Sequence, residues 1–171
     1  MNIILIGFKA AGKSTIGRKL SKRTGMDFID LDSYIVQLHD EEKRENINCR
    51  EIFNKYGERY FRELEKNALN AIKTENTVLA VGGGAVESEK NRSRIKRLGK
   101  VIYLFNNKDI LFSRIENQGL PPFMDSDNPR ESFETLFKKR DLLYKTVADD
   151  IIICDNLSYE DILDEIIKVM E

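Results

Sequence analysis

The stretch that decides the fold is Asn2-Ile3-Ile4-Leu5-Ile6-Gly7-Phe8-Lys9-Ala10-Ala11-Gly12-Lys13-Ser14. Its apolar first part predicts a buried strand, and residues 15–23, with Ile16 and Leu20 four apart, predict a helix. Between them stands the pattern G-x-x-x-x-G-K-S, whose backbone N–H groups can surround a phosphate at the positive end of the helix dipole. A plain glycine turn would leave the Gly-Lys-Ser ending unexplained, so we predict a bound nucleotide.

Two side chains of this loop carry specific chemistry. The ammonium of Lys13 would reach the outer phosphates, and the hydroxyl of Ser14 would ligate Mg²⁺. Asp30 and Asp32 follow the next predicted strand, where one carboxylate can hold Mg²⁺, directly or through water, and the other can accept a proton from an alcohol. The alternative is that one of the two caps the helix that begins near Ser33.

A second glycine-rich segment, Gly82-Gly83-Gly84, follows the predicted strand 77–81. Glycines lack a Cβ and therefore let the backbone approach a ligand or another loop closely. The alternative is a tight turn before the helix that begins at Ser88. Three successive glycines exceed what a turn needs, so we favour ligand contact.

Three arginines are candidate anion ligands: Arg59, Arg62 and Arg140. Arg62 lies at the rim of a helix face formed by Phe61 and Leu64, and a guanidinium suits a carboxylate or phosphate. An ion pair with Glu65 on a solvated face explains Arg62 equally well. Arg140 has the same two interpretations.

Strand-like and helical patterns alternate along the whole chain. This alternation predicts parallel pairing through right-handed crossovers, a sheet covered on both faces, and function at the carboxyl ends of the strands. We therefore predict one α/β domain over residues 1–171. The predicted strands are 2–6, 27–29, 77–81, 101–105 and 151–153, the helices are 15–23, 33–39, 50–56, 59–73, 88–98, 109–116, 129–144 and 158–170, and the exposed loops are 40–48 and 118–128.

Composition limits the partners. The 171 residues carry a net charge of −1, with 41% hydrophobic and 33% charged residues, which leaves no basic excess for nucleic acid. No apolar run reaches membrane-spanning length, and Met1 leads straight into a strand, so we expect no signal peptide. Cys49 and Cys154 predict neither a disulfide framework nor a zinc site, which fits the cytoplasm. His39, the only histidine, is expected on the solvated surface.

Together these segments resemble the shikimate kinase family over nearly the whole chain. The order and spacing of the matches are specific, although no single match is decisive. The resemblance implies a three-layer P-loop kinase fold with a five-stranded parallel sheet in the order 2-3-1-4-5, a substrate-binding helical region at about 33–62 and a mobile lid at about 117–128. It also implies transfer of the ATP γ-phosphate to the 3-hydroxyl of shikimate. The matching segments are Ile6 to Ser14, Phe28 to Asp32, Glu51 to Phe53, Gly57-Glu58, Phe61 to Glu65, Gly82 to Val86, Arg140 to Tyr144 and Val147 to Asp149.

The resemblance also implies a role for each matching residue. Asp32 would bind the substrate hydroxyls and take the proton, acting in catalysis with Lys13, while Asp30 would support the Mg²⁺ on Ser14 through water. The ATP-binding residues would be Ala10, Ala11, Gly12, Lys13, Ser14 and Thr15, with Arg114 near the adenine. The substrate-binding residues would be Asp32, Phe53 and Phe61 at the ring, Arg62 and Arg140 at the carboxylate, and Gly82, Gly83 and Gly84. ATP, Mg²⁺ and shikimate are the expected cofactors and partners of a monomer.

Two departures from the family pattern concern the acceptor. Counting back from Arg140, Pro121 stands where the family's lid carries an arginine that meets the transferring phosphate. Pro122 and Phe123 could still close over the substrate, and Lys9 is a candidate substitute for the missing cation. The other departure is a longer segment at 40–48.

Three alternative hypotheses therefore stay open. The Pro121 lid suggests a kinase of the same fold that acts on another small hydroxy acid or alcohol, or an inactive paralogue. A non-catalytic GTP-binding regulator would need an acid at the end of the guanine-reading motif that Asn107-Lys108 begins, but that position holds Ile110.

Overall fold

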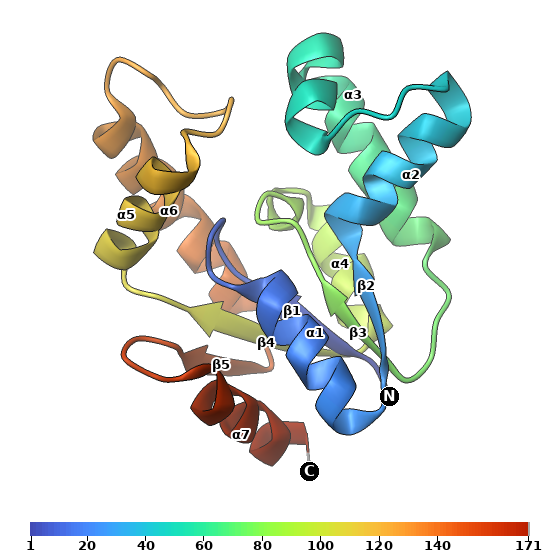
Figure 1. Ribbon diagram of the computed structural model, residues 1–171, viewed down its shortest axis with the longest axis vertical. Helices are drawn as coiled ribbons and strands as arrows, with labels where there is room; N and C mark the ends of the chain where they lie inside the picture. The colour runs from blue at the N-terminus through green and yellow to red at the C-terminus, as the bar shows by residue number, and fades with distance from the viewer. Residues whose placement is uncertain (171) are drawn as a thin grey trace.

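The computed structural model describes residues 1–170. Its five strands form one parallel sheet in the order β2-β3-β1-β4-β5, which confirms the expected α/β class and strand order (Figure 1). The central strand β1 is buried along its whole length, which explains why its sequence is apolar throughout rather than alternating. The strands are β1 (Ile3–Ile6), β2 (Asp27–Asp30), β3 (Thr77–Ala80), β4 (Lys100–Phe105) and β5 (Asp150–Ile153).

Helices cover both faces of the sheet and create two hydrophobic clusters. Ile3 and Leu5 of β1 belong to the cluster beneath α1 (Lys13–Thr24) and α7 (Tyr159–Met170). Ile4 and Ile6 point to the opposite cluster, because successive side chains of a strand alternate between faces. The elements on that side include α3 (Cys49–Ala71), η1 (Ala85–Glu87), α4 (Glu89–Leu98) and α6 (Pro129–Val147).

Two helical lobes rise beyond the carboxyl ends of the strands (Figure 1). One consists of α2 (Leu31–Lys43) with the first part of α3, and the other of α5 (Lys108–Gln118) with the first part of α6. The segment 119–128, which links α5 to α6, lies at the edge of the second lobe. This arrangement places the site between the lobes.

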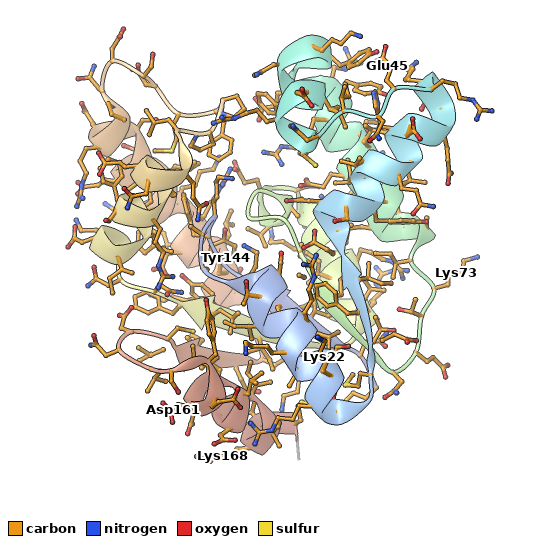
Figure 2. All side chains as sticks on the ribbon, in the orientation of Figure 1. Lys22, Glu45, Lys73, Tyr144, Asp161 and Lys168 are labelled. Carbon is orange, nitrogen blue, oxygen red and sulfur yellow. The ribbon has the colours of Figure 1, made fainter. Side chains whose placement is uncertain are left out.

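Three boundaries agree closely with the sequence analysis. Pro129 stands in the first turn of α6. Ser88 caps α4 through the N–H of Asn91. Ser158 and Asp161 exchange hydrogen bonds in a capping box at the start of α7, within one residue of the predicted helix start. Lys73, Asp161 and Lys168 lie at the periphery of the view in Figure 2. Lys22 is also exposed, whereas Tyr144 is fully buried.

The segment around His39 was predicted incorrectly. Helix α2 continues to Lys43, so residues 40–43 are helical rather than a loop. His39 is fully buried and not a surface residue, because it lies one turn beyond Ile35 on the inner face of α2 and packs against the rings of Tyr56 and Tyr60. The Tyr60 hydroxyl lies 3.0 Å from its Nδ1.

Helix α3 confirms the predicted division into two helical pieces. It is interrupted at Gly57, whose φ of 83° and ψ of 169° are not helical. Glycine adopts this left-handed φ without a Cβ clash. The interruption redirects the first part of α3 toward the site. No helix within residues 1–170 is long and apolar enough to cross a membrane.

Candidate active site

The loop between β1 and α1 has the geometry of a phosphate-binding loop. Ala10 and Gly12 adopt positive φ values of 67° and 87°, which turn the backbone sharply before the helix. The Nζ of Lys13 donates hydrogen bonds to the carbonyls of Gly7, at 2.9 Å, and Phe8, at 2.8 Å. Burial lowers the pKa of Lys13 to about 8, against the raising influence of Asp32 and Asp30. An arriving polyphosphate would supply the anion that this ammonium lacks.

Asp30 connects the loop to the acceptor side. Its Oδ1 accepts hydrogen bonds from the N–H groups of Asp32, at 3.1 Å, and Ser33, at 3.3 Å, and so caps α2. Its Oδ2 accepts the hydroxyl hydrogen bond of Ser14. The capping and functional interpretations of this aspartate are therefore compatible. The adjacent hydroxyl and carboxylate oxygens fit Mg²⁺, which prefers hard oxygen ligands and takes the remainder from phosphates and water.

Asp32 is the carboxylate that the family resemblance predicts as the proton acceptor. Burial, followed by repulsion from Asp30, raises the pKa of Asp32, while Lys13, Lys9 and Arg62 oppose the increase. A carboxylate with a raised pKa is a stronger base than one in water. Gly82 permits this placement, because a Cβ there would lie 2.8 Å from Oδ1 of Asp32.

The other two glycines make room for further parts of the site. A Cβ on Gly84 would lie 2.6 Å from both Nη atoms of Arg62, and one on Gly83 would lie 3.2 Å from the backbone N of Lys9. The Tyr144 hydroxyl donates to the Gly83 carbonyl at 2.6 Å. The predicted close approach of this segment is thus confirmed for the neighbouring protein groups.

Arg62 combines both interpretations that its sequence left open. Its Nη1 donates to both carboxylate oxygens of Glu65 at 3.2 Å, so the expected ion pair forms. However, Glu65 is only 2% exposed and lies in the cavity rather than on a solvated face. Burial raises the pKa of Glu65 to about 7, although Arg62 acts in the opposite direction.

Arg140 is held by a partner that the sequence did not reveal. It is 2% exposed, and its Nε and Nη2 lie 2.9 and 2.7 Å from Oε1 of Glu87. The guanidinium carbon lies 5.4 Å from the ring centroid of Phe8 and 5.0 Å from that of Phe123. These contacts fix the orientation of the guanidinium, because cation–π and ion-pair geometry restrict it from several sides.

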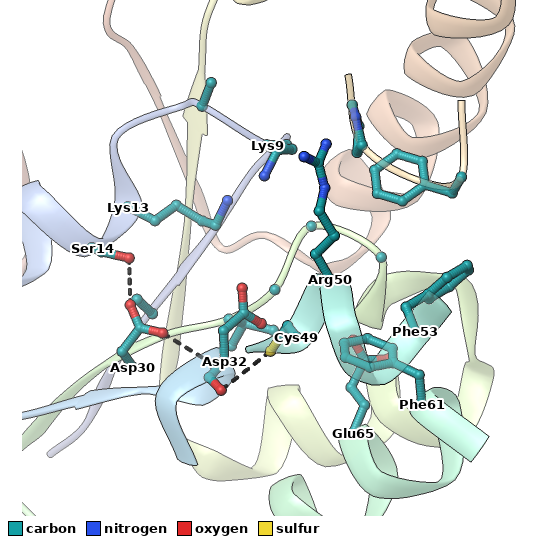
Figure 3. A pocket seen from close by; sticks show the side chains of 18 of the residues that line it. Lys9, Lys13, Ser14, Asp30, Asp32, Cys49, Arg50, Phe53, Phe61 and Glu65 are labelled. Atoms are coloured by element: carbon teal, nitrogen blue, oxygen red, sulfur yellow. Dashed lines mark hydrogen bonds between the residues drawn. The ribbon is translucent and has the colours of Figure 1, made fainter. Parts of the chain in front are cut away.

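These groups enclose one cavity of about 460 Å³ (Figure 3). Ala11 and Arg114 do not line it: Ala11 is buried in the loop, and Arg114 donates to the Ala10 carbonyl at 3.0 Å. The predicted residues that line it are Ala10, Gly12, Lys13, Ser14, Thr15, Asp30, Asp32, Phe53, Phe61, Arg62, Gly82, Gly83, Gly84 and Arg140, together with Lys9, Pro121, Pro122 and Phe123.

The sequence analysis missed six lining residues: Cys49, Arg50, Glu65, Ala80, Val81 and Gln118. Glu65 was considered only as a surface partner of Arg62. The position of Arg50 beside the matched segment Glu51 to Phe53 was the only available signal for it. Cys49 gave none, and burial raises the pKa of its thiol to about 12, so it stays protonated.

A phosphate loop, a carboxylate with a raised pKa and two arginines that line the same cavity define a P-loop kinase for a small molecule. The shikimate kinase family model matches residues 9–171. The chain is 37% identical to the shikimate kinase of Vibrio parahaemolyticus, covering 99% of this chain and 96% of that protein. It is 38% identical to the enzyme of Actinobacillus pleuropneumoniae, covering 99% and 95%.

Solved structures of shikimate kinases also match this chain. The shikimate kinase of Acinetobacter baumannii in complex with shikimate matches with a TM-score of 0.88 and 32% identity, over 99% of this chain and 92% of that one. The enzyme of Bacteroides thetaiotaomicron matches with a TM-score of 0.84 and 30% identity, over 99% and 98%. The chain belongs to the shikimate kinase family, as its sequence predicted, and is an ATP-dependent kinase.

Proposed function

We propose that this chain transfers the γ-phosphoryl group of ATP to the 3-hydroxyl of shikimate. The observation that carries the proposal is the convergence of Lys13, Asp32, Arg62 and Arg140 on one cavity from four separate segments. The shikimate complex of the Acinetobacter baumannii relative supports the choice of acceptor.

The donor half holds the phosphates. Backbone N–H groups of residues 10–15 and the ammonium of Lys13 bind the β- and γ-phosphates. Ser14 and Asp30 would hold Mg²⁺, Asp30 through water, and the ion would neutralise charge on the phosphate oxygens when bound. Arg114 supports the loop through the Ala10 carbonyl and lies near the adenine.

The acceptor half orients the hydroxyl. Arg62 and Arg140 bind the carboxylate of shikimate, Phe53 and Phe61 contact its ring, and the N–H of Gly83 donates to it. Asp32 accepts the proton of the 3-hydroxyl as the oxygen bonds to phosphorus. The bond from phosphorus to the β,γ-bridging oxygen breaks, and its electron pair stays on ADP. Catalysis is thus positioning and charge stabilisation.

The segment at about 117–128 acts as a lid over a monomeric kinase domain. Pro121, Pro122 and Phe123 line the cavity from this segment. Their closure excludes water, which would otherwise compete with the acceptor hydroxyl.

The test is a kinase assay with ATP, Mg²⁺ and a panel of small hydroxy acids that includes shikimate, with products identified by phosphorus NMR. We expect shikimate to be turned over best and to carry phosphate on its 3-oxygen. Lys13→Met should abolish turnover, whereas Lys22→Met, an exposed lysine on the same helix, should retain it. Preferred turnover of another acid would contradict the proposed acceptor.

A further inference from the structure

Besides Lys13 of the phosphate loop, two of the cations that line the cavity lack a carboxylate partner. Arg62 is paired with Glu65 and Arg140 with Glu87, while Lys13 is bound by backbone carbonyls. Within residues 1–170, neither Lys9 nor Arg50 lies within ion-pair distance of an acidic side chain. Their charges are therefore available to an anion that enters the cavity.

The position of Arg50 opposes a local preference of helices. It stands in the first turn of α3, after the N-cap Asn48, where the positive end of the helix dipole disfavours a cation. A residue that breaks such a rule without a local gain is often there for function. No acidic side chain in the described part of the chain forms an ion pair with Arg50, so nothing local compensates its unfavourable interaction with the helix dipole.

The Arg50 side chain reaches across the cavity to the lid. Its Nη2 donates to the carbonyls of Gly119, at 3.4 Å, and Leu120. In Figure 3 it extends from the start of α3 toward the part of the cavity where Lys9 and Lys13 project. Helix α3 and the lid are thus linked by one side chain, although they are far apart in the sequence.

The lid carbonyls orient the guanidinium without neutralising it. A guanidinium has five N–H donors in a planar fork, and both carbonyls accept from the same nitrogen. Nε and Nη1 of Arg50 donate to no other group in the described part of the chain, so they can serve an anion. A charged, oriented and unpaired donor set facing a phosphate loop is what a transferring phosphoryl group requires.

We propose that Arg50 is the catalytic cation that contacts the transferred phosphoryl group, presented from α3 and oriented by the lid carbonyls. This inference rests on the proposed function. As the phosphorus leaves the bridging oxygen of ATP and bonds to the acceptor oxygen, whose proton goes to Asp32, Arg50 stabilises the charge on its equatorial oxygens. The cation comes from the acceptor-side helix, so the lid needs no arginine at Pro121.

The test compares Arg50→Gln and Arg50→Ala with the matched control Arg59→Gln. Arg59 lies on the same helix, is exposed and does not line the cavity. We expect kcat of the Arg50 variants to fall on the order of 10²–10³-fold, with KM for ATP and Tm close to wild type. Free guanidinium at low concentration should restore part of the kcat of Arg50→Ala. The control Arg59→Gln should have the kcat, KM and Tm of the wild type.

Lys9→Met is the rival variant, because Lys9 is the other unpaired cation. If Lys9→Met loses kcat and Arg50→Gln keeps it, the phosphate cation is Lys9 and the proposal is overturned. A raised KM with normal kcat in Arg50→Gln would also overturn it, since that result means that Arg50 only fastens the lid. Failure of the proposed function is a separate outcome, in which the wild-type chain itself does not phosphorylate shikimate.

Discussion

The two halves of the cavity are built in different ways. The phosphate side comes from one contiguous segment, residues 7–15, and uses mainly backbone N–H groups and one helix terminus. The acceptor side comes from α2, α3, the glycine segment after β3, and α6, and it uses side chains. Two of its arginines are held by carboxylates, Arg62 by Glu65 and Arg140 by Glu87. A backbone site is encoded locally, whereas a side-chain site depends on tertiary packing.

The difference between the two halves predicts that a substitution on the acceptor side can abolish phosphoryl transfer while ATP still binds on the phosphate side. Asp32→Asn should lower kcat by about 10²–10⁴-fold, the usual contribution of a general base, because an amide cannot take the hydroxyl proton. Calorimetry should find ATP affinity close to wild type. Asp27→Asn, at the exposed start of the same strand, is the control and should be fully active. Near wild-type turnover by Asp32→Asn would place the proton acceptor elsewhere.

A smaller effect is expected from adding a single methyl group to the acceptor side. Gly84 has φ −86° and ψ −12°, which alanine adopts without strain, but its Cβ would displace the Arg62 guanidinium. Gly84→Ala should raise KM for shikimate about tenfold, equivalent to about 1.4 kcal/mol, with little change in Tm because the displaced atoms are the far end of a long side chain. Steady-state kinetics would show this.

The double variant Gly84→Ala with Arg62→Ala provides the control for that substitution. If the methyl group acts through the guanidinium, it should add no further loss once Arg62 is removed. Additive losses would mean that Gly84 contacts the substrate independently of Arg62.

Glu65 predicts a pH dependence of stability. Burial raises its folded-state pKa from 4.5 to about 7, so the folded state binds a proton that the unfolded state releases. The stabilisation from this proton is full below about 4.5 and is lost as the pH rises to about 7. In Glu65→Gln the free energy of unfolding should fall less steeply across this window, by up to about 1.4 kcal/mol per pH unit. Denaturant unfolding of both proteins at several pH values measures this difference. If the free energy of unfolding depends on pH in the same way in both, the raised pKa of Glu65 is refuted.

The smallest expected effect concerns the backbone of the donor side. Ala10 adopts a φ of 67°, a left-handed conformation that costs a residue with a Cβ about 1–2 kcal/mol. Ala10→Gly should therefore stabilise the fold by about 0.5 kcal/mol, after allowing for the greater entropy of glycine in the unfolded chain. Ala11→Gly, at a buried position without positive φ, should destabilise it. Thermal unfolding distinguishes the two, and equal shifts would contradict the argument.

Most of the architecture could be predicted because its signals are local. Apolar runs, helical spacing and cap residues such as Ser88 and Ser158 are properties of short segments. The errors lie where packing overrides a local signal. The charged residues Asp40 to Lys43 follow His39 and predict a loop, yet α2 continues through them and the aromatic rings of α3 bury His39.

The residues of the site also divide into those with a local sequence signal and those without one. Motif and spacing predicted Lys13, Ser14, Asp30 and Asp32 as site residues. Arg62 and Arg140 were candidates from their sequence context, and the family resemblance assigned them to the substrate carboxylate. Glu87 and Arg50 were missed because their roles depend on partners far along the chain, Arg140 for the first and the lid carbonyls for the second.

The sequence alone determined the parallel α/β class and the phosphate loop, because each depends on residues that are neighbours in the chain, and it determined the kinase family from the order and spacing of short segments. Only the tertiary structure decided how the acceptor side is charged: which carboxylates hold Arg62 and Arg140, and that Arg50 reaches the lid unpaired. The physical reason is the distance along the chain between the residues that interact. A backbone loop is specified by its own dihedral angles, whereas the charge left free in a cavity depends on every side chain that folding brings to it.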